Sequence, residues 1–424
     1  MNQQINVRIN QLNNSIVPKG YKKTDFGIFP SDWETDKTFG DLFDFYGGLS
    51  KSRDELGENG YPYIHYGDLH KGAFNKVSFE QYEQMPKCDI SLTGKETCLM
   101  EDGDVAFVDA SEDLEGTSRA VLIDNPDNKP FIAGLHIIYG KSKDESITKW
   151  YKQYITTAES TKKQFQKLAS GFKVYGLNRN TLPKIHIAYP KSTEEQKKIA
   201  KILMKWDEAI ELYQKEIEAL HKLKKAYLSV LFPKKGEATP KYRFKGFTDP
   251  WEQRKLGDMC DEFQSGKSIK ASDITDSGEY AVYGGNGFRG YTDTYNHDGD
   301  YALIGRQGAL CGNMNFSSGK AYFTEHAVAV HGNADNDTLF LYYLLDLMNL
   351  GQYSGQSAQP GLAVNKIIQL KTKAPKLDEQ RLISSFFKQL DYLITLHQRK
   401  CESIIQQRKA LQQYLLTGIV RVGQ

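Results

Sequence analysis

The two halves of the chain repeat each other in sequence, and this duplication limits the folds open to its 424 residues more than any other feature. Early in each half, PSDWETDKTFGDLFDFYGGLSKS at 30–52 matches TDPWEQRKLGDMCDEFQSGKSIK at 248–270. Late in each half, GLNRNTLPKIHIAYPKSTEEQ at 176–196 matches GLAVNKIIQLKTKAPKLDEQ at 361–380. Offsets of 185–218 residues are too long for a solenoid. The sequence therefore predicts two copies of a whole domain, each followed by the same appendage.

The appendage is a predicted long helix, because its apolar residues recur in steps of four and three. They stand at Ile199, Leu203, Trp206, Ile210, Tyr213, Ile217, Leu220 and Tyr227 in the first copy, and at Ile383, Phe387, Leu390, Ile394, His397, Cys401, Ile404, Leu411 and Leu415 in the second. A 3.5-residue period held over about five heptads is typical of a coiled-coil seam. The second helix can pack on the first only by running back, so the pair is expected to be antiparallel, with the C-terminus near the first domain. An intermolecular coiled coil in a homodimer is the alternative.

The predicted fold class is α+β: two mixed α/β domains separated by two long antiparallel coiled-coil helices, with a pseudo-two-fold internal repeat. Short strand-like runs such as DVAFVDA and YALIGR alternate with turns, and helices are expected at 147–170 and 336–350. The expected parts are a polar N-terminal tail at 1–20, a first globular domain at 21–190, a first long helix and linker at 191–235, a second globular domain at 236–375, and a second long helix with a C-terminal tail at 376–424.

Composition narrows the classes of function. The net charge of +2 provides no global field for nucleic acid, although 191–235 and 376–424 are each +4. Five scattered cysteines without a CxxC pair favour neither a disulfide framework nor a zinc site and fit a reducing cytoplasm. No apolar run approaches the roughly 18–20 residues of a membrane span. We therefore expect a cytoplasmic protein that does not contact a membrane.

Two segments resemble phosphate-binding motifs, but neither meets the requirements of its motif. The run from Gly285 to Gly290 fits GxGxxG, but strand-like sequence follows it instead of the helix that a phosphate site requires. Gly266-Lys267-Ser268 resembles the end of a P-loop, yet Asp261 stands where the leading glycine belongs. The histidines show no tight ligand spacing. The sequence predicts no catalytic residue, no cofactor site and no metal site in this chain.

Two acid-free basic tracts at matching positions of the repeat indicate nucleic-acid binding. Residues 160–193 hold seven Lys or Arg and no Asp or Glu, and 347–377 hold four Lys and again no acid. Lysine and arginine neutralise phosphates, and nearby amides can pair with base edges. A solvated basic loop is the alternative reading for either tract.

A second candidate is the loop after a predicted middle strand of each domain. EDGDVAFV at 101–108 matches HDGDYALI at 297–304, which places Ala110-Ser111 opposite Arg306-Gln307. Because these loops differ chemically, the two domains are expected to read different sequences. The candidate DNA-binding residues of these features are Lys162, Lys163, Lys167, Lys173, Tyr175, Arg179, Asn180, Ser111, Arg306, Gln307, Gln356, Gln359, Asn365 and Lys366. Arg289, in the Gly285–Gly290 run, is a further candidate.

Taken together, these features resemble the specificity subunits of type I restriction–modification enzymes. SGQSAQPGLAVNKIIQLKTKAPKLDEQ at 354–380 resembles that family's run of Gly-Leu-Asn, a strand, Pro and a Glu-Gln helix start, whereas the counterpart at 170–196 lacks the Gln-Pro pair. The resemblance implies two target-recognition domains that each read one half of a bipartite site on double-stranded DNA, and helices that set the spacer and dock partners.

The resemblance also implies a chain without a catalytic centre of its own. Its partners would be two copies of a DNA methyltransferase subunit and, in some members, two copies of a restriction/translocase subunit. Those partners would carry S-adenosylmethionine, and ATP with Mg²⁺ where a nuclease is present. The alternatives are a self-sufficient DNA methyltransferase or nuclease, and a two-headed protein-binding spacer without DNA function.

Overall fold

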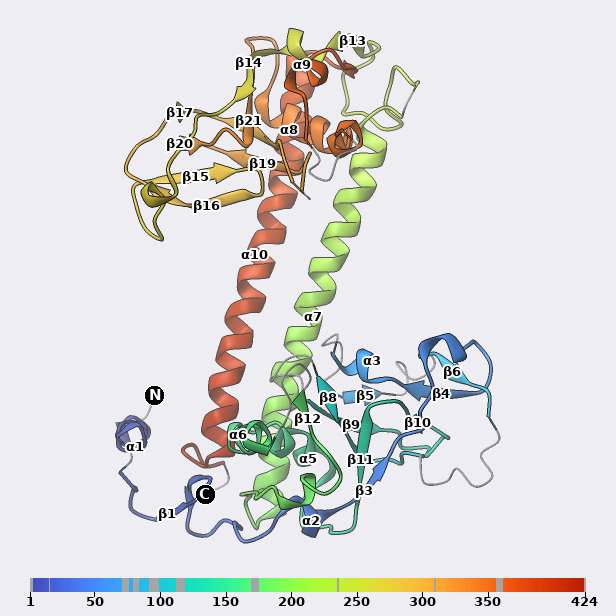
Figure 1. Cartoon of the computed structure of the whole chain (residues 1–424), viewed down its shortest axis with the longest axis vertical. Helices are drawn as coiled ribbons and strands as arrows, with labels where there is room; N and C mark the ends of the chain where they lie inside the picture. The colour runs from blue at the N-terminus through green and yellow to red at the C-terminus, as the bar shows by residue number, and fades with distance from the viewer. Residues whose placement is uncertain are drawn as a thin grey trace. The chain divides into compact units, whose positions relative to one another are not determined.

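A computed structural model of the chain describes residues 3–14, 16–70, 76–78, 84–90, 99–111, 119–168, 175–234, 236–308, 310–355 and 361–422. The chain divides into two compact units, one made of 1–213 with 400–424 and the other of 214–399. Each unit holds one globular domain and parts of both long helices (Figure 1).

The two long helices are α7 (Thr193–Leu231) and α10 (Leu377–Leu416). In the first unit the start of α7 meets the end of α10, where Arg408 Nε lies 2.8 Å from Asp207. In the second unit the end of α7 meets the start of α10, where Lys224 Nζ lies 2.6 Å from Asp391. Because the start of each helix lies beside the end of the other, the two helices run in opposite directions. The predicted antiparallel pair is confirmed.

The heptad residues lie on the buried or half-buried side of each helix. Ile199, Leu203, Phe387 and Cys401 are buried, as the periodicity predicts. Tyr227 is 37% exposed, but its ring meets that of Phe386 on α10 edge-on at 4.9 Å, so it packs across the pair as the seam predicts. Between Leu220 and Tyr227 the seam position is occupied by the ion-paired Lys224, and Leu228 packs against the second core.

The first domain is built on an open sheet in the order β3-β11-β7-β9-β5, in which only the β5–β9 pair is parallel. The strands are β3 (Phe43–Gly47), β11 (Ile137–Ser142), β7 (Val105–Val108), β9 (Ala120–Asp124) and β5 (Lys76–Ser78). A smaller sheet joins β10 (Ile132–Ala133), β4 (Tyr61–Ile64) and β6 (Lys87–Cys88).

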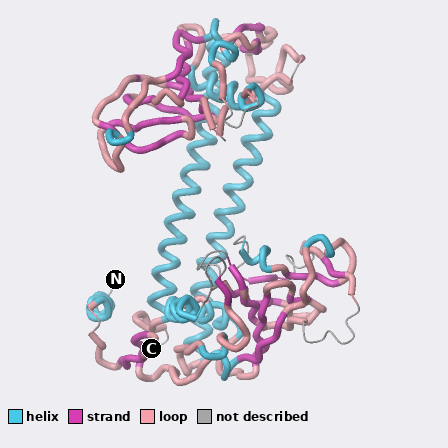
Figure 2. Tube along the Cα trace, in the orientation of Figure 1, coloured by secondary structure: helices cyan, strands magenta, loops and turns pink. Residues whose placement is uncertain are grey.

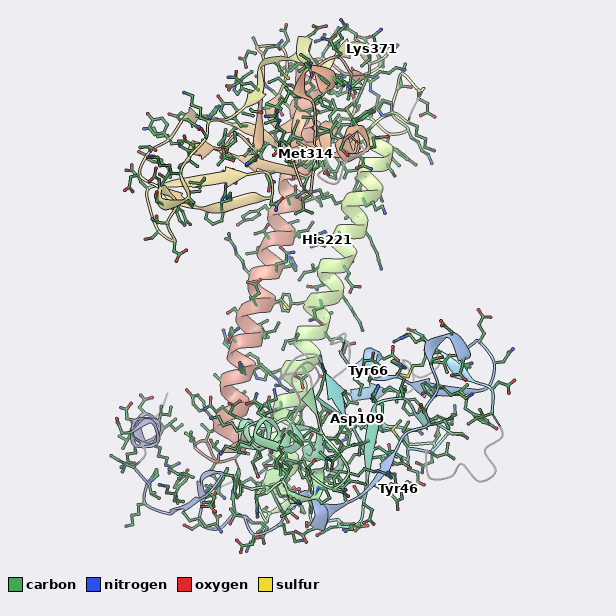
Figure 3. All side chains as sticks on the ribbon, viewed as in Figure 1. Tyr46, Tyr66, Asp109, His221, Met314 and Lys371 are labelled. Carbon is green, nitrogen blue, oxygen red and sulfur yellow. The ribbon has the colours of Figure 1, made fainter. Side chains whose placement is uncertain are left out.

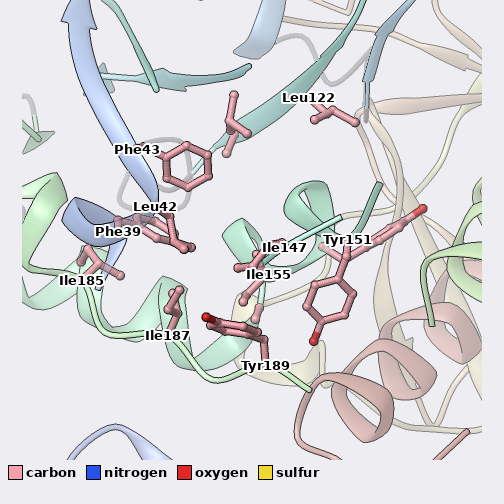
Figure 4. Packing of buried hydrophobic residues seen from close by; sticks show 14 of the residues in the cluster. Phe39, Leu42, Phe43, Leu122, Ile147, Tyr151, Ile155, Ile185, Ile187 and Tyr189 are labelled. Carbon is pink, nitrogen blue, oxygen red and sulfur yellow. The ribbon is translucent and has the colours of Figure 1, made fainter. Parts of the chain in front are cut away.

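Both faces of β7 are buried, which explains why its sequence is a continuous apolar run. Val105 and Phe107 face the core shared with α5 (Lys149–Thr156) and α7, whereas Ala106 and Val108 face the second core of this domain. Figure 4 shows part of the first of these cores, where residues such as Phe43 and Leu122 gather with Tyr151 and Ile155 of α5.

The second domain repeats this scaffold with the order β14-β21-β18-β19. These strands are β14 (Cys260–Ser265), β21 (Ala327–Gly332), β18 (Tyr301–Gly305) and β19 (Met314–Ser317). A second sheet contains β16 (Gly287–Thr292), β15 (Tyr280–Gly284), β20 (Lys320–Phe323) and β17 (His297–Asp298). Figure 2 shows mixed helix and strand in both globular parts, and α7 and α10 as uninterrupted helices. The predicted fold class and internal repeat are confirmed.

Three shorter helices differ in their bounds from what the sequence predicts. The helix expected over 147–170 is two helices, because α5 ends at the Thr157 cap before α6 (Glu159–Leu168) begins. The helix expected at 336–350 is α8 (Thr338–Leu347), capped by Asp337, which accepts a hydrogen bond from Phe340 N at 2.7 Å. Within the polar N-terminal stretch, Gln3–Asn13 form α1.

A buried glutamine fastens the start of each long helix to its domain. The Gln196 side chain accepts a hydrogen bond from Thr148 N at 2.8 Å and donates to the carbonyl oxygens of Ser146 and Pro190. Gln380 likewise accepts from Asp337 N at 2.9 Å and donates to Asn336 and Pro375. The Glu-Gln pair of the repeat therefore ties α7 to the start of α5, and α10 to the start of α8.

The glutamate before each glutamine pairs with an arginine that comes from a different part of the chain in each domain. Glu379 pairs with Arg243 at 2.5 Å, in the link that follows α7. Glu195 pairs at 2.6 Å with Arg421, in the tail after α10, and Arg421 also reaches Asp32 at 2.9 Å. The C-terminal tail thus supplies the arginine that pairs with the buried glutamate of the first domain, and the internal link supplies the corresponding arginine for the second domain.

Replacing Arg421 with Ala is expected to lower the free energy of unfolding by about 3–5 kcal/mol, because it leaves the buried Glu195 carboxylate without its partner. Urea denaturation of the full chain measures the loss. Lys197→Ala removes an exposed ion pair with Glu194 and should cost less than about 1 kcal/mol. Equal effects of the two variants would contradict this account.

Candidate nucleic-acid interface

In each domain, the acid-free basic tract and the loop after the middle strand lie next to each other. In the second domain, the loop after β18 meets the end of the acid-free tract: Leu362 N donates to Arg306 O at 2.9 Å, and Gln307 bridges to Gly361. In the first domain, β8 (Ala110–Ser111) pairs with β12 (Tyr175–Gly176). In each domain, therefore, two segments that are far apart in sequence together form one edge, which we call the composite edge.

The hydrogen bonds that hold these edges also correct the repeat alignment by one residue. Arg306 N donates to His326 O, and it is Asp109 N that donates to the equivalent His136 O. Gly361 bridges Gln307, whereas the equivalent Gly176 pairs with Ala110. Asp109-Ala110, and not Ala110-Ser111, thus stand opposite Arg306-Gln307.

The burial of the strand residues explains why the repeat alignment was shifted by one residue. Val105 and Phe107 face the helix-side core of the first domain, and Ala302 and Ile304 face that of the second. Aligning the two Asp-Gly-Asp turns sets Val105 opposite Tyr301, which faces the other side. The second domain has one additional residue between its turn and the matching point of the strand, so alignment of identical letters gave the wrong register.

Close backbone packing builds the edge in the second domain. A Cβ atom at Gly305 would lie 2.2 Å from the carbonyl oxygen of Gly285, so the β15–β16 turn rests directly on the loop after β18. A Cβ atom at Gly312 would lie 2.2 Å from Gly351 N, which brings in the 3₁₀ turn Leu350–Tyr353. The GxGxxG-like run is therefore part of a β hairpin, as its strand-like continuation indicated.

Basic and apolar side chains emerge from these layered turns. Arg306 Nη1 donates to Ser265 Oγ at 3.3 Å, and the Arg289 chain lies against Gly284. Three large apolar side chains are exposed there, Phe288 at 54%, Leu310 at 49% and Tyr353 at 44%. Guanidinium groups bind phosphates and exposed aromatic rings stack on bases, so both kinds of side chain suit a nucleic-acid surface.

The first domain presents a different chemistry at the matching place. His136 Nδ1 lies 2.9 Å from the Asp109 carboxylate, and its ring meets Tyr66 edge-on at 5.2 Å. Figure 3 labels Asp109 and Tyr66, which come from the loop after β7 and from α3 (Tyr66–His70). Burial, with help from Arg53, lowers the pKa of the neighbouring His65. The two composite edges therefore carry unlike side chains.

The remaining predicted residues are spread over each domain. Lys162, Lys163 and Lys167 lie on α6, where Lys163 faces Glu159 at 3.7 Å and Lys162 lines a small groove with Lys409 of α10. Asn180 turns back on Asn178 through its backbone, and Asn365 and Lys366 are exposed on α9 (Val364–Ile367). Lys173, Gln356 and Gln359 lie outside the described residues, as do the side chains of Ser111 and Tyr175.

Not every basic residue of the tracts belongs to the composite edges. Lys191 faces Glu34 at 3.8 Å, and Lys376 faces Asp249 at 3.1 Å. Lys373 donates to the carbonyl oxygen of Glu237. These side chains have partners within the protein, so the absence of acids from a tract is only partly a binding signal.

The carbonyl oxygens of His136 and His326 hold both edges, and neither histidine was among the predicted site residues. The signal was present, because each repeat carries a histidine directly before its inner strand, in GLHII and TEHAV. Among the residues that the structure describes, no group of three or more His, Cys, Asp or Glu is placed to hold a metal ion. No described helix is both long and apolar enough to cross a membrane.

Comparison with known protein families gives this duplicated arrangement its name. Residues 30–222 and 248–406 both match the type I restriction modification DNA specificity domain. The chain belongs to this family. Its two repeats are two specificity domains, each matched together with most of its long helix.

Full-length similarity to specificity subunits agrees with this assignment. The putative type I restriction enzyme MjaX specificity subunit of Methanocaldococcus jannaschii is 24% identical and is matched over 97% of its length and 95% of this chain. The EcoprrI specificity subunit of Escherichia coli is 40% identical over 146 residues, which span 36% of that relative and 34% of this chain. The crystal structure of the S subunit from M. genitalium shares the fold at a TM-score of 0.64, with 20% identity over 91% of this chain and 96% of that one.

The backbone packing of the second specificity domain can be tested with Gly305→Ala. The added methyl group meets the Gly285 carbonyl, so we expect the free energy of unfolding to fall by about 1–3 kcal/mol in urea. Gly361→Ala is the matched control, because its Cβ would lie at an ordinary 3.8 Å from the nearest atom. A Gly305→Ala chain as stable as the control would show that the turns are not packed as described.

Proposed function

We propose that this chain is the DNA-reading subunit of a type I restriction–modification complex, and that each specificity domain reads one half of a bipartite site. One observation carries this proposal: the same scaffold builds a composite edge in both domains, but fills it with different side chains. A buried scaffold with variable exposed loops is the arrangement expected of a reader, since base contacts specify sequence while the framework positions them.

We propose further that the chain itself catalyses nothing. Its partners would be two copies of a DNA methyltransferase subunit and, where restriction is present, two copies of a nuclease/translocase subunit. S-adenosylmethionine, and ATP with Mg²⁺, would then be bound by those partners, and the complex would work in the cytoplasm. The family assignment supports this division of labour, because the related full-length chains are specificity subunits.

Exchange of one domain tests the modular reading. Replacing 251–375 with the equivalent domain of a relative should change one half of the recognised site and leave the other half as it was. The site is measured by sequencing the duplexes that the full chain selects from a randomised pool. A change in both halves, or in neither, would contradict independent reading by the two domains.

Phosphate contacts by α6 can be separated from base reading by their dependence on salt. Replacing Lys162, Lys163 and Lys167 together with Ala should flatten the slope of log affinity against log salt by up to about one unit per lost contact. The matched control removes three exposed lysines outside the tracts, Lys241, Lys245 and Lys255. If the α6 variant kept the slope of the unaltered chain, α6 would not lie on DNA.

The two helices are proposed to act as a ruler for the spacer between half-sites. Inserting one heptad after Leu212 and one after Leu396, both exposed, preserves the 3.5-residue seam. Seven residues add about 10 Å, or roughly three base pairs, and three base pairs turn the groove by about 100°. Recognition should therefore shift to a longer spacer or fail, with both half-site sequences unchanged. Full affinity for the original spacer would refute the ruler.

A further inference from the structure

The two domains place an arginine guanidinium at the same point of the scaffold, although their loops differ. That point is the end of the edge strand, at Gly47 of β3 and at Ser265 of β14. Gly47 pairs with Ile138, and Ser265 pairs with Val328. Ile138 and Val328 each follow the scaffold histidine, His136 or His326, by two residues. Gly47 and Ser265 are therefore equivalent positions.

A guanidinium group lies beside each of these positions. Arg306 Nη1 donates to Ser265 Oγ at 3.3 Å. A Cβ atom at Gly47 would lie 3.8 Å from both Cζ and Nη1 of Arg179, so the Arg179 guanidinium lies over the Gly47 backbone. The side chain that Gly47 lacks would contact Arg179, just as the Ser265 side chain contacts Arg306.

The two arginines reach this point from different segments of the chain. Arg306 comes from the loop after the middle strand, where the first domain has Asp109. Arg179 comes from the acid-free tract, three residues after Gly176, where the second domain has Val364. Duplication cannot have copied the guanidinium, because neither arginine has an arginine at its own equivalent position. The scaffold point is shared, and its occupant is supplied independently.

Both arginines also stand at the composite edge itself. Leu362 N bonds to the Arg306 carbonyl, and Leu177 N, two residues before Arg179, bonds to the Asp109 carbonyl. A guanidinium offers two parallel donors that match O6 and N7 of guanine, which is the commonest specific contact in the major groove. Lysine can also bind a phosphate, as a point charge, so exchanging arginine for lysine keeps the charge and removes the planar fork.

We propose that Arg179 and Arg306 are the specificity-determining residues for one guanine in each half-site. This assignment rests on the proposed function, since it names the residues by which the two domains read DNA. It predicts that the two half-sites, although unlike in sequence, each contain a G·C pair that depends on one arginine.

The test is selection of duplexes from a randomised pool by the full chain and its variants, followed by sequencing. Arg306→Ala and Arg306→Lys should each lose preference for guanine, by about tenfold or more, at one base pair of one half-site. Arg179→Ala and Arg179→Lys should do the same at one base pair of the other half-site. The lysine variants keep the charge and guard against misfolding. Arg254→Ala in the second domain and Lys143→Ala in the first remove ion pairs with Glu252 and Asp44, and are controls that should leave the selected site unchanged.

Three outcomes would overturn the assignment while leaving DNA reading by the chain intact. The variants could select the unaltered site, they could lose affinity uniformly over all sequences with lysine restoring it, or a half-site could contain no G·C pair. Failure of the unaltered chain to select any sequence would instead overturn the proposed function itself.

Discussion

A neutral amide buried at the start of each long helix holds the structure of each unit together. Gln196 and Gln380 are fully buried, and each uses its oxygen and its amino group on backbone or side-chain groups of the adjoining domain. An amide can satisfy three partners without the large desolvation cost of a buried charge. Because these bonds join the helix to the first turn of α5 or α8, they fix the direction in which the coiled-coil seam leaves the domain.

The contacts around that amide divide the molecule into an invariant part and a variable part. The glutamine clamp, the glutamate–arginine pair and the histidine carbonyl recur in both domains with nearly equal geometry. The side chains on the composite edge do not recur: Asp109 faces His136 in one domain, and Arg306 faces Ser265 in the other. Burial constrains the glutamine clamp and the glutamate–arginine pair, since a substitution there would leave a polar partner unsatisfied, whereas each histidine contributes a backbone carbonyl. The second group is free to change without loss of the fold.

Much of the fold could be predicted from sequence because its signals are periodic or duplicated. The heptads of α7 and α10 extend over about five repeats, so single irregularities such as Lys224 did not hide them. The register of the middle strands could not be predicted in the same way. Identical Asp-Gly-Asp letters outweighed a one-residue difference that only the direction of Val105 and Ala302 reveals.

Candidate residues were predictable as a class but not as a surface. A lysine that joins the scaffold, such as Lys376, has the same sequence signature as one that is free to bind a phosphate. The partner that distinguishes them, Asp249, lies 127 positions away in the chain. Likewise, the alignment gives no indication that Arg179 and Arg306 occupy one scaffold point, because the coincidence arises only after folding.

The pairing of Glu195 with Arg421 has a consequence for the order in which the chain matures. The two residues are 226 positions apart, whereas the second unit, 214–399, is continuous in sequence. During synthesis the second unit can close first, although it begins later, because domains generally fold as units once their chain is available. The Glu195–Arg421 contact of the first unit can form only after the tail has been made. A chain that stops short of residue 421 would therefore leave the buried Glu195 carboxylate of the first unit without its arginine.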